Sequence, residues 1–109
     1  MNQNIKTELD RIVSTLAKTG IVTKIILFGS YAKGEETSNS DIDLCVLTPI
    51  KPQSNIQLIA DFRQLVWDIN TTPLDLLAYN QEHFYFHAKR PTSLEYEIAE
   101  TGVSLYEHR

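Results

Sequence analysis

Two aspartates separated by one residue, Asp41 and Asp43, are the first feature of this sequence that could do chemistry. In an extended strand, residues i and i+2 point to the same face, roughly 6.6 Å apart. Two carboxylates held side by side repel each other, and each resists ionisation unless a cation lies between them. Hard oxygen ligands of this kind favour Mg²⁺ or Mn²⁺. The alternative is a solvent-facing strand on which the two charges only increase solubility.

A Gly29-Ser30 pair follows directly after an apolar stretch, and ten residues separate it from Asp41. A glycine at a helix start lets backbone N–H groups approach a phosphate, and the helix start favours anions. The Ser30 hydroxyl can donate to a phosphate oxygen, and Gly34 is suited to end the turn. By itself a Gly-Ser pair is more typical of an ordinary turn. Together with the two carboxylates, it describes a site for a nucleoside triphosphate with Mg²⁺.

The elements that must position these residues follow from hydrophobic periodicity. Apolar residues spaced by three and four predict helices over 5–17 and 54–70, and short runs rich in β-branched residues predict strands over 21–28, 41–48 and 74–79. Asn80 is expected to cap a helix reaching about Ala88, Thr92 or Ser93 to cap another ending at Gly102, and 103–107 to add a short strand. We therefore expect an α/β (α+β) fold: a single domain over residues 1–109 with a small mixed sheet of three to four strands covered by helices.

Alternation along the predicted strands sets which side chains share a face. The strand 41–48 places Asp41, Asp43 and Cys45 on one side, and the strand 74–79 carries Asp75 on one of its faces. Asp75 is either a third acid of the site or an outward-facing strand residue. Cys45 and Trp67 are interpreted as core or near-core residues. In the 54–70 helix the predicted apolar stripe runs through Ile56, Ile59, Phe62, Val66 and Ile69 and is widened by Leu58 and Leu65; in the last helix Leu94 and Ile98 are expected to face inward.

Composition excludes several classes of protein. Ten Lys and Arg against fourteen Asp and Glu give a formal net charge of −4 over 109 residues. A chain that binds polymeric DNA or RNA normally has a basic surface, so direct nucleic-acid binding is not expected. Cys45 is the only cysteine, which favours a reducing, cytoplasmic compartment. Neither a signal peptide nor a membrane-spanning run is expected from the polar start and the short apolar stretches.

The combined motif gives a specific resemblance. Residues 26–47 read ILFGSYAKGEETSNSDIDLCVL, which resembles the signature of the DNA polymerase β-like nucleotidyltransferase superfamily. The short length resembles its minimal nucleotidyltransferase (MNT) domains, and the order of elements extends the likeness over most of the chain. The resemblance implies that Gly29 and Ser30 grip the triphosphate and that Asp41 and Asp43 bind two divalent metals, with Asp75 as the third acid.

The reaction implied by the resemblance is two-metal nucleotidyl transfer. One metal would stabilise the leaving pyrophosphate, and the other, bridged by the aspartates and held by Asp75, would activate an acceptor hydroxyl for attack on the α-phosphorus. The sequence departs from the family at Tyr31-Ala32-Lys33, where many members carry an arginine after the serine. Lys33 could replace part of that charge, but as a point charge instead of a bidentate fork.

The same resemblance suggests a partner. Many MNT proteins are encoded beside a helical HEPN protein and act as its antitoxin by adding AMP to a toxin tyrosine. We therefore expect a protein adenylyltransferase (class 2.7.7) that uses ATP with two Mg²⁺ ions, Mn²⁺ being an alternative, and acts on a separate HEPN chain in a homo- or hetero-oligomer away from membranes. The alternative is a binding antitoxin that neutralises its partner by occlusion without catalysis. A sugar-nucleotide glycosyltransferase would need a much longer chain.

A second cluster stands apart from the motif. His83 and His87 are spaced i and i+4 on a predicted helix, which suits either a transition-metal pair or two ordinary surface residues. The adjacent Phe84-Tyr85-Phe86 cannot all face inward on one helix, so they are interpreted either as a partner-binding patch or as packing under the last helix.

Overall fold

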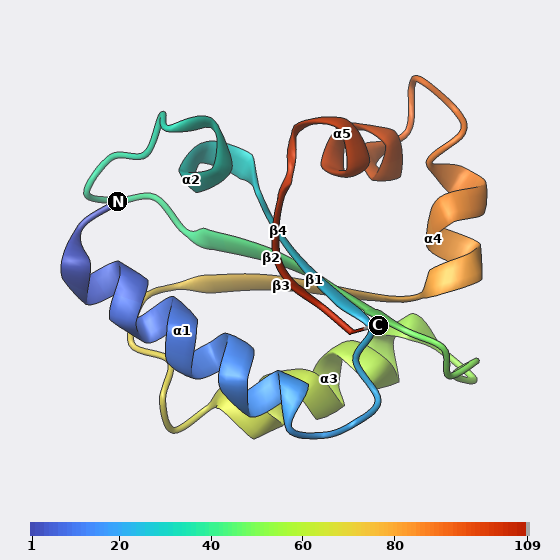
Figure 1. The fold of residues 1–109 in the computed structure, drawn as a ribbon, viewed down its shortest axis with the longest axis horizontal. Helices are drawn as coiled ribbons and strands as arrows, with labels where there is room; N and C mark the ends of the chain where they lie inside the picture. The colour runs from blue at the N-terminus through green and yellow to red at the C-terminus, as the bar shows by residue number, and fades with distance from the viewer. Residues whose placement is uncertain (109) are drawn as a thin grey trace.

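The computed structural model describes residues 1–108, whose helices and strands alternate along much of the chain (Figure 1). The helices are α1 (Gln3–Ala17), α2 (Gly29–Lys33), α3 (Asn55–Val66), α4 (Gln81–His87) and α5 (Leu94–Thr101). The strands are β1 (Lys24–Phe28), β2 (Ile42–Thr48), β3 (Leu74–Asn80) and β4 (Val103–Glu107). This order confirms the predicted α/β fold class, including the short closing strand.

The four strands form one mixed sheet in the order β3-β2-β1-β4. β1 runs antiparallel to both β2 and β4, whereas β2 and β3 are parallel, with Ile42 opposite Leu74 and Thr48 opposite Asn80. A parallel pair needs a crossover connection, and α3 supplies it. Because β2 and β3 start at the same edge of the sheet, the residues that open them lie side by side.

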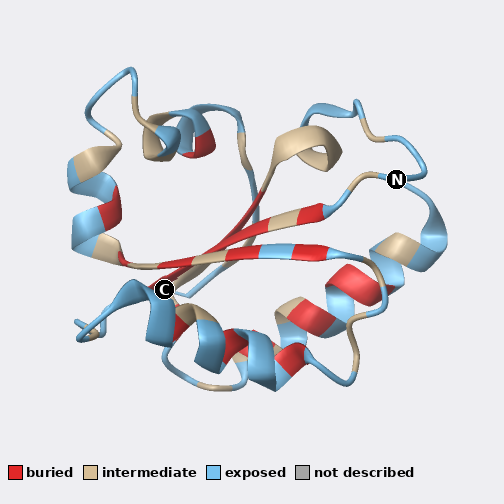
Figure 2. Cartoon of the chain, turned by 180° about the vertical axis from the view of Figure 1, so that it is seen from behind, coloured by how far each residue is buried: buried red, intermediate tan, exposed pale blue. Residues whose placement is uncertain are grey.

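The sheet separates two hydrophobic cores. Leu44 and Val46 of β2 belong to the larger core, which packs against α1 and α3, whereas Cys45 and Leu47 belong to the smaller core, which packs against α4 and α5. In Figure 1, α1 and α3 lie on one side of the sheet and α4 and α5 on the other. The buried positions of α1 and α3 turn toward the strands (Figure 2). The predicted alternation of β2 is therefore confirmed.

Side-chain caps fix the starts of the helices that flank the sheet. The capping side chains accept a hydrogen bond from a backbone N–H three residues on, and they are Asn2, Ser54, Asn80 and Ser93. At the other end of α2, Gly34 adopts φ +70°, the left-handed conformation that ends a helix. The predictions for Asn80, Ser93 and Gly34 are confirmed.

The apolar stripe of α3 is narrower than the sequence predicts. The helix ends at Val66, and its buried residues are Leu58, Phe62 and Val66. Ile56 is 80% exposed, Trp67 71% and Leu65 49%, so their predicted packing in the core is wrong. A single stripe with a spacing of four residues is enough to seat the helix on the sheet, which leaves the neighbouring apolar residues outside.

One strand boundary and one predicted buried residue also differ from expectation. The first strand starts at Lys24, not at Ile21, although the Thr23 N–H still donates to the Leu47 carbonyl at 2.8 Å. On α5, Ile98 is buried as predicted but Leu94 is 47% exposed.

Among residues 1–108, none of the helices combines the length and apolar character needed to cross a membrane.

We expect Phe62→Ala to lower the free energy of unfolding by about 3–5 kcal/mol, because its ring lies in the larger core at 1% exposure. Ile56→Ala, on the same helix but 80% exposed, is the matched control and should change it by less than about 0.5 kcal/mol. Urea denaturation of the two variants measures both values. Equal losses would contradict the placement of α3.

Candidate nucleotide and metal site

The parallel pairing of β2 and β3 brings two carboxylates together at the start of the strands. Asp43 lies directly opposite Asp75 in the register, on the sheet face shared with Cys45 and Leu77. This is the face covered farther along the strands by α4 and α5. Asp43 is half-buried and Asp75 is exposed, so both remain accessible from one side. The structure thus places the two acids together, as the sequence predicts.

Gly29 brings the glycine-serine turn against Asp43. It follows Phe28, which pairs with Asp43 across β1 and β2, and it adopts φ +72°. A Cβ added at this position would overlap the Asp43 carboxylate oxygen Oδ2. Only glycine combines that backbone conformation with so close an approach. Ser30 and the first turn of α2 therefore lie at the same end of the sheet as the acids.

The remaining predicted acid, Asp41, lies just outside the strand. β2 begins at Ile42 instead of Asp41, and the Asp41 side chain is exposed. The pKa of Asp43 is nevertheless raised above its usual value, first by burial and then by the negative charges of Asp75 and Asp41. The three carboxylates are therefore electrostatically coupled, with Asp43 in the middle.

This donor set fits a hard divalent cation. A cation between Asp41, Asp43 and Asp75 would offset both the burial and the carboxylate repulsion that raise the Asp43 pKa. Within residues 1–108, no three acidic, histidine or cysteine side chains are placed so that they could hold a metal ion by themselves. Mg²⁺ is commonly held by one or two carboxylates together with water and substrate phosphates, so an open set of acids suits it better than a closed cage.

Lys33 has a partner that sequence reasoning missed. Its Nζ lies 3.1 Å from Oε1 of Glu97, and this exposed ion pair joins α2 to α5. The two residues lie 64 positions apart, so no local pattern in the sequence could reveal the pairing. To reach a phosphate, the Lys33 ammonium would have to exchange Glu97 for the new anion. Lys33 as a phosphate ligand remains a prediction.

The histidine cluster lies at the opposite end of β3 from Asp75. His83 and His87 lie on α4, which begins after Asn80, with ring centroids 4.3 Å apart. In the same helix Phe84 is buried, whereas Tyr85 and Phe86 are exposed. The expectation that the three aromatics cannot all face inward is confirmed. The cluster takes no part in the acid site.

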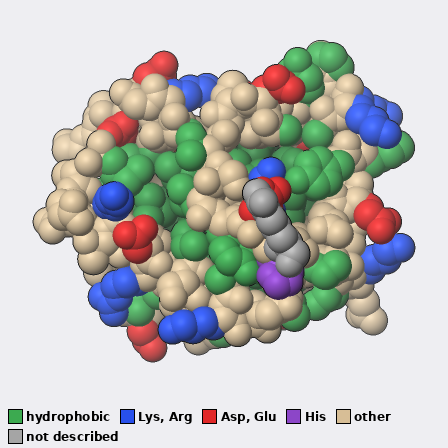
Figure 3. Space-filling model, in the orientation of Figure 1, with side chains coloured by type: hydrophobic (Ala, Val, Ile, Leu, Met, Phe, Trp, Pro, Cys, Tyr) green, Lys and Arg blue, Asp and Glu red, His purple; other side chains and the backbone are tan. Residues whose placement is uncertain are grey.

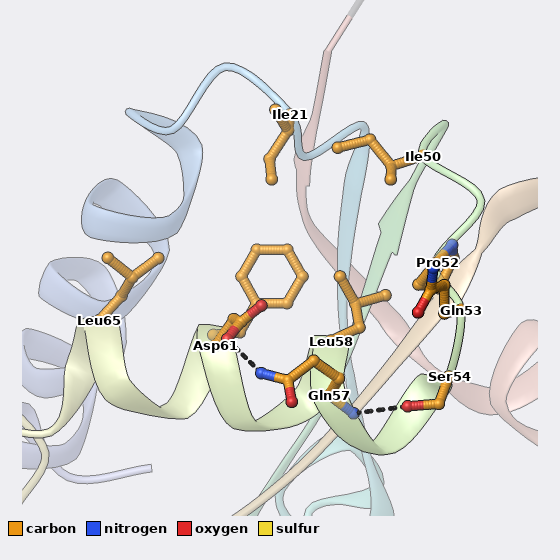
Figure 4. Close-up of a pocket in the computed structure, with 10 residues that line it drawn as sticks. Ile21, Ile50, Pro52, Gln53, Ser54, Gln57, Leu58, Asp61 and Leu65 are labelled. Atoms are coloured by element: carbon orange, nitrogen blue, oxygen red, sulfur yellow. Dashed lines mark hydrogen bonds between the residues drawn. The ribbon is translucent and has the colours of Figure 1, made fainter.

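The apolar groove in Figure 4 is also separate from the acids. It has a volume of about 530 Å³ and lies between α3 and the loops that precede β1 and follow β2. Ile21, Ile50 and Leu65 line it, together with Ser54, whose hydroxyl caps α3. Because Ile50 follows the far end of β2, this groove is remote from Asp43.

On the face in Figure 3, cationic and acidic side chains are interspersed.

The fold and the acid-bearing strands define a class of protein. Residues 6–100 match the nucleotidyltransferase domain family, and the chain belongs to it. It is a nucleotidyltransferase. A candidate protein adenylyltransferase of Methanocaldococcus jannaschii is 34% identical over 71 residues, which cover 62% of this chain and 71% of the relative. A bifunctional uridylyltransferase/uridylyl-removing enzyme of Novosphingobium aromaticivorans is 40% identical over 52 residues, covering 47% of this chain but 6% of that protein.

Solved structures share the fold at low sequence identity. A candidate nucleotidyltransferase from Sulfolobus solfataricus superposes with a TM-score of 0.64 at 17% identity, covering 94% of this chain and 79% of that one. A chain of the MntA-HpeT toxin-antitoxin complex superposes with a TM-score of 0.61 at 23% identity, covering 100% of this chain and 75% of that one. A third structure is the complex of the tri-AMPylated HEPN toxin of Shewanella oneidensis with its MNT antitoxin. One of its chains superposes with a TM-score of 0.52 at 18% identity, covering 94% of this chain and 72% of that one.

Replacing Gly29 tests the close approach of the turn to Asp43. We expect Gly29→Ala to destabilise the protein more than Gly34→Ala, because a Cβ at Gly34 meets nothing within 4 Å whereas one at Gly29 overlaps Asp43. The two glycines have nearly equal φ values of +72° and +70°, so backbone strain of about 1–2 kcal/mol is common to both. Thermal denaturation compares the pair. Equal losses would show that Asp43 does not contact the turn.

The coupling of the acids predicts the titration of Asp43. Asp75→Asn should lower the Asp43 pKa, because it removes a nearby negative charge, and Asp68→Asn in the exposed turn after α3 should not. Because folding raises the Asp43 pKa above 3.8, this carboxylate lowers the free energy of unfolding as the pH rises past that value. NMR titration of the side-chain carboxyl carbon measures the pKa. An unchanged value in Asp75→Asn would place the two acids apart.

Proposed function

We propose that this nucleotidyltransferase transfers AMP from ATP to a tyrosine hydroxyl of a separate HEPN-type protein, and so acts as the antitoxin of a toxin–antitoxin pair. The observation that carries the proposal is Asp43 opposite Asp75, on two parallel strands, with Gly29 packed against Asp43. Adenylylation of a protein is the activity named for the relative from M. jannaschii. Two structures of the same fold come from toxin–antitoxin complexes, one of them holding a tri-AMPylated HEPN toxin.

In this proposal, each residue of the site has a distinct task. Asp41, Asp43 and Asp75 would hold Mg²⁺, which supplies charge neutralisation of the triphosphate and lowers the pKa of the acceptor hydroxyl. The backbone N–H groups at Gly29-Ser30 bind the phosphates, aided by the Ser30 hydroxyl. The acceptor hydroxyl gives up its proton to water and its oxygen bonds to the α-phosphorus, while the bond from that phosphorus to the bridging oxygen breaks and pyrophosphate leaves. The chain contributes position and charge, not a nucleophile of its own.

The acceptor is inferred to come from another protein. The acids lie at the end of the sheet where β2 and β3 start, and Asp75 is exposed there, so a side chain from a docked partner can reach them. The net charge of −4 favours a basic partner over a nucleic acid. A structure of the same fold with a TM-score of 0.51 was obtained with AMP-PNP, which supports an adenine nucleotide as the donor.

Intact-mass measurement tests this function. We expect the chain, a candidate HEPN partner, ATP and Mg²⁺ to give mass increments of AMP on the partner. Asp43→Ala should slow this transfer by at least about 100-fold, the scale on which a lost electrostatic stabiliser acts. It should not lower the free energy of unfolding, because it removes a repelling charge. Asp68→Ala, an exposed change of the same charge, should transfer AMP like the wild type.

The competing function is neutralisation by occlusion. A tight complex that forms without any gain in mass, in the wild type and in Asp43→Ala alike, would replace the enzymatic proposal with that of a binding antitoxin. Loss of folding in Asp43→Ala would show that the acids are structural.

A further inference from the structure

A buried glutamate on the other side of the sheet joins α1 to the start of β3. Glu8 is only 8% exposed, and its carboxylate accepts hydrogen bonds from Asn70, Thr71 and Thr72. Its Oε2 accepts from the Asn70 side-chain amide at 2.8 Å and from the backbone N–H groups of Thr71 at 2.8 Å and Thr72 at 2.9 Å. Its Oε1 accepts from the hydroxyls of Thr71 and Thr72, both at 2.8 Å. We call these four residues the Glu8 clasp.

The clasp holds its carboxylate in the charged state. Burial acts to raise the Glu8 pKa, but the hydrogen bonds from Thr72 and Thr71 outweigh it and lower the pKa to about 2. Because the folded-state pKa lies below the ordinary value of 4.5, the clasp stabilises the fold fully above that pH. This stabilisation is lost as the pH falls toward 2. At neutral pH the clasp is therefore a permanent feature, in which one carboxylate accepts from donors of three successive residues.

The clasped turn leads directly into the candidate site. The Asn70 amide also donates to the Thr72 carbonyl at 2.6 Å, and the next carbonyl, that of Pro73, accepts from the Ile42 N–H at 2.8 Å. Ile42 opens β2, and Asp43 follows it. Leu74 and Asp75 follow Pro73 and pair with Ile42 and Asp43. Asp75 thus lies three residues after Thr72, the last residue of the clasp.

The position of β3 in the sheet makes such an anchor necessary. β3 is an edge strand, so β2 is its only neighbour in the sheet. A slip of one residue in the pairing would turn Asp75 to the opposite face, away from Asp43. Two side chains from outside the sheet hold the start of β3 in place. Glu8 binds the turn that precedes the strand, and Arg63 Nη1 donates to the Leu74 carbonyl at 3.0 Å. Of the two, only Glu8 binds backbone N–H groups before the strand begins.

We propose that Glu8 is a positioning residue for nucleotidyl transfer: it holds the turn before β3 so that Asp75 lies opposite Asp43. The inference rests on the proposed function for its catalytic consequence, while the structural part concerns the register of β2 and β3 alone. Glu8 itself touches none of the three acids; it acts through the backbone of Thr71, Thr72 and Pro73.

The chemistry of the clasp separates two substitutions. Glu8→Gln keeps one oxygen for the three N–H donors, and its amide can donate to the threonine hydroxyls, which accept as well as donate. Glu8→Ala leaves all the donors without their acceptor. Leu16→Ala is the matched control, since Leu16 is a buried residue of the same helix that takes no part in the clasp.

The experiment compares these three variants with the wild type at a temperature where all are folded. Glu8→Ala should slow AMP transfer by about 10- to 100-fold, the effect of losing an outer partner of a metal ligand. Hydrogen exchange of the Ile42 amide, which bonds to Pro73, should accelerate in the same variant. Glu8→Gln should restore both, and Leu16→Ala should transfer AMP at the wild-type rate despite its lower stability.

Two results would overturn the inference: a wild-type transfer rate in Glu8→Ala, or an equal loss of rate in Leu16→Ala. If the wild type itself transfers no AMP, the proposed function fails, and hydrogen exchange of the Ile42 amide decides the structural part alone. Faster exchange confined to Glu8→Ala then supports the claim that Glu8 holds the turn before β3, and unchanged exchange would refute that claim.

Discussion

Repulsion between Asp43 and Asp75 is the constraint on which the candidate site depends. The register of two parallel strands sets the carboxylates opposite each other. Burial first, and then the negative charges of Asp75 and Asp41, raise the pKa of Asp43, so its charged form is disfavoured unless a cation is near. A fold keeps such a pair only if other interactions hold the strands in place. Here the large apolar core, the α3 crossover and the caps of the surrounding helices supply that stability. The stored repulsion is then available to favour a cation.

The two faces of the sheet have separate roles. The face under α1 and α3 carries most of the buried apolar residues, and the Glu8 clasp lies on that side. On the other face, α4 and α5 pack over Cys45 and Leu47 of β2, while Asp43 remains half-buried and Asp75 exposed at the starts of the strands. Gly29 brings the phosphate-binding turn to that accessible end, because no side chain separates it from Asp43.

Much of this arrangement could be predicted from local signals. Alternation in 41–48 and the spacing of Gly29-Ser30 to Asp41 placed the turn and the acids at one end of the sheet, and Asn80, Ser93 and Gly34 marked helix ends correctly. Long-range contacts could not be predicted. The Lys33–Glu97 pair and the Glu8 clasp each join residues more than sixty positions apart. The sequence pattern wrongly predicts that Trp67 and Ile56 pack in the core. Hydrophobicity alone does not show that only a narrow stripe of α3 contacts the sheet.

The central claim is that the glycine-serine turn and the acids of two strands form one site for a metal-bound nucleotide. Paramagnetic broadening of amide NMR signals by Mn²⁺, in the presence of a non-hydrolysable ATP analogue, measures this most directly. The account predicts that broadening centres on Gly29, Ser30, Asp43 and Asp75 together. Broadening centred on His83 and His87 at the far end of β3, or on Asp43 without Gly29 and Ser30, would contradict it.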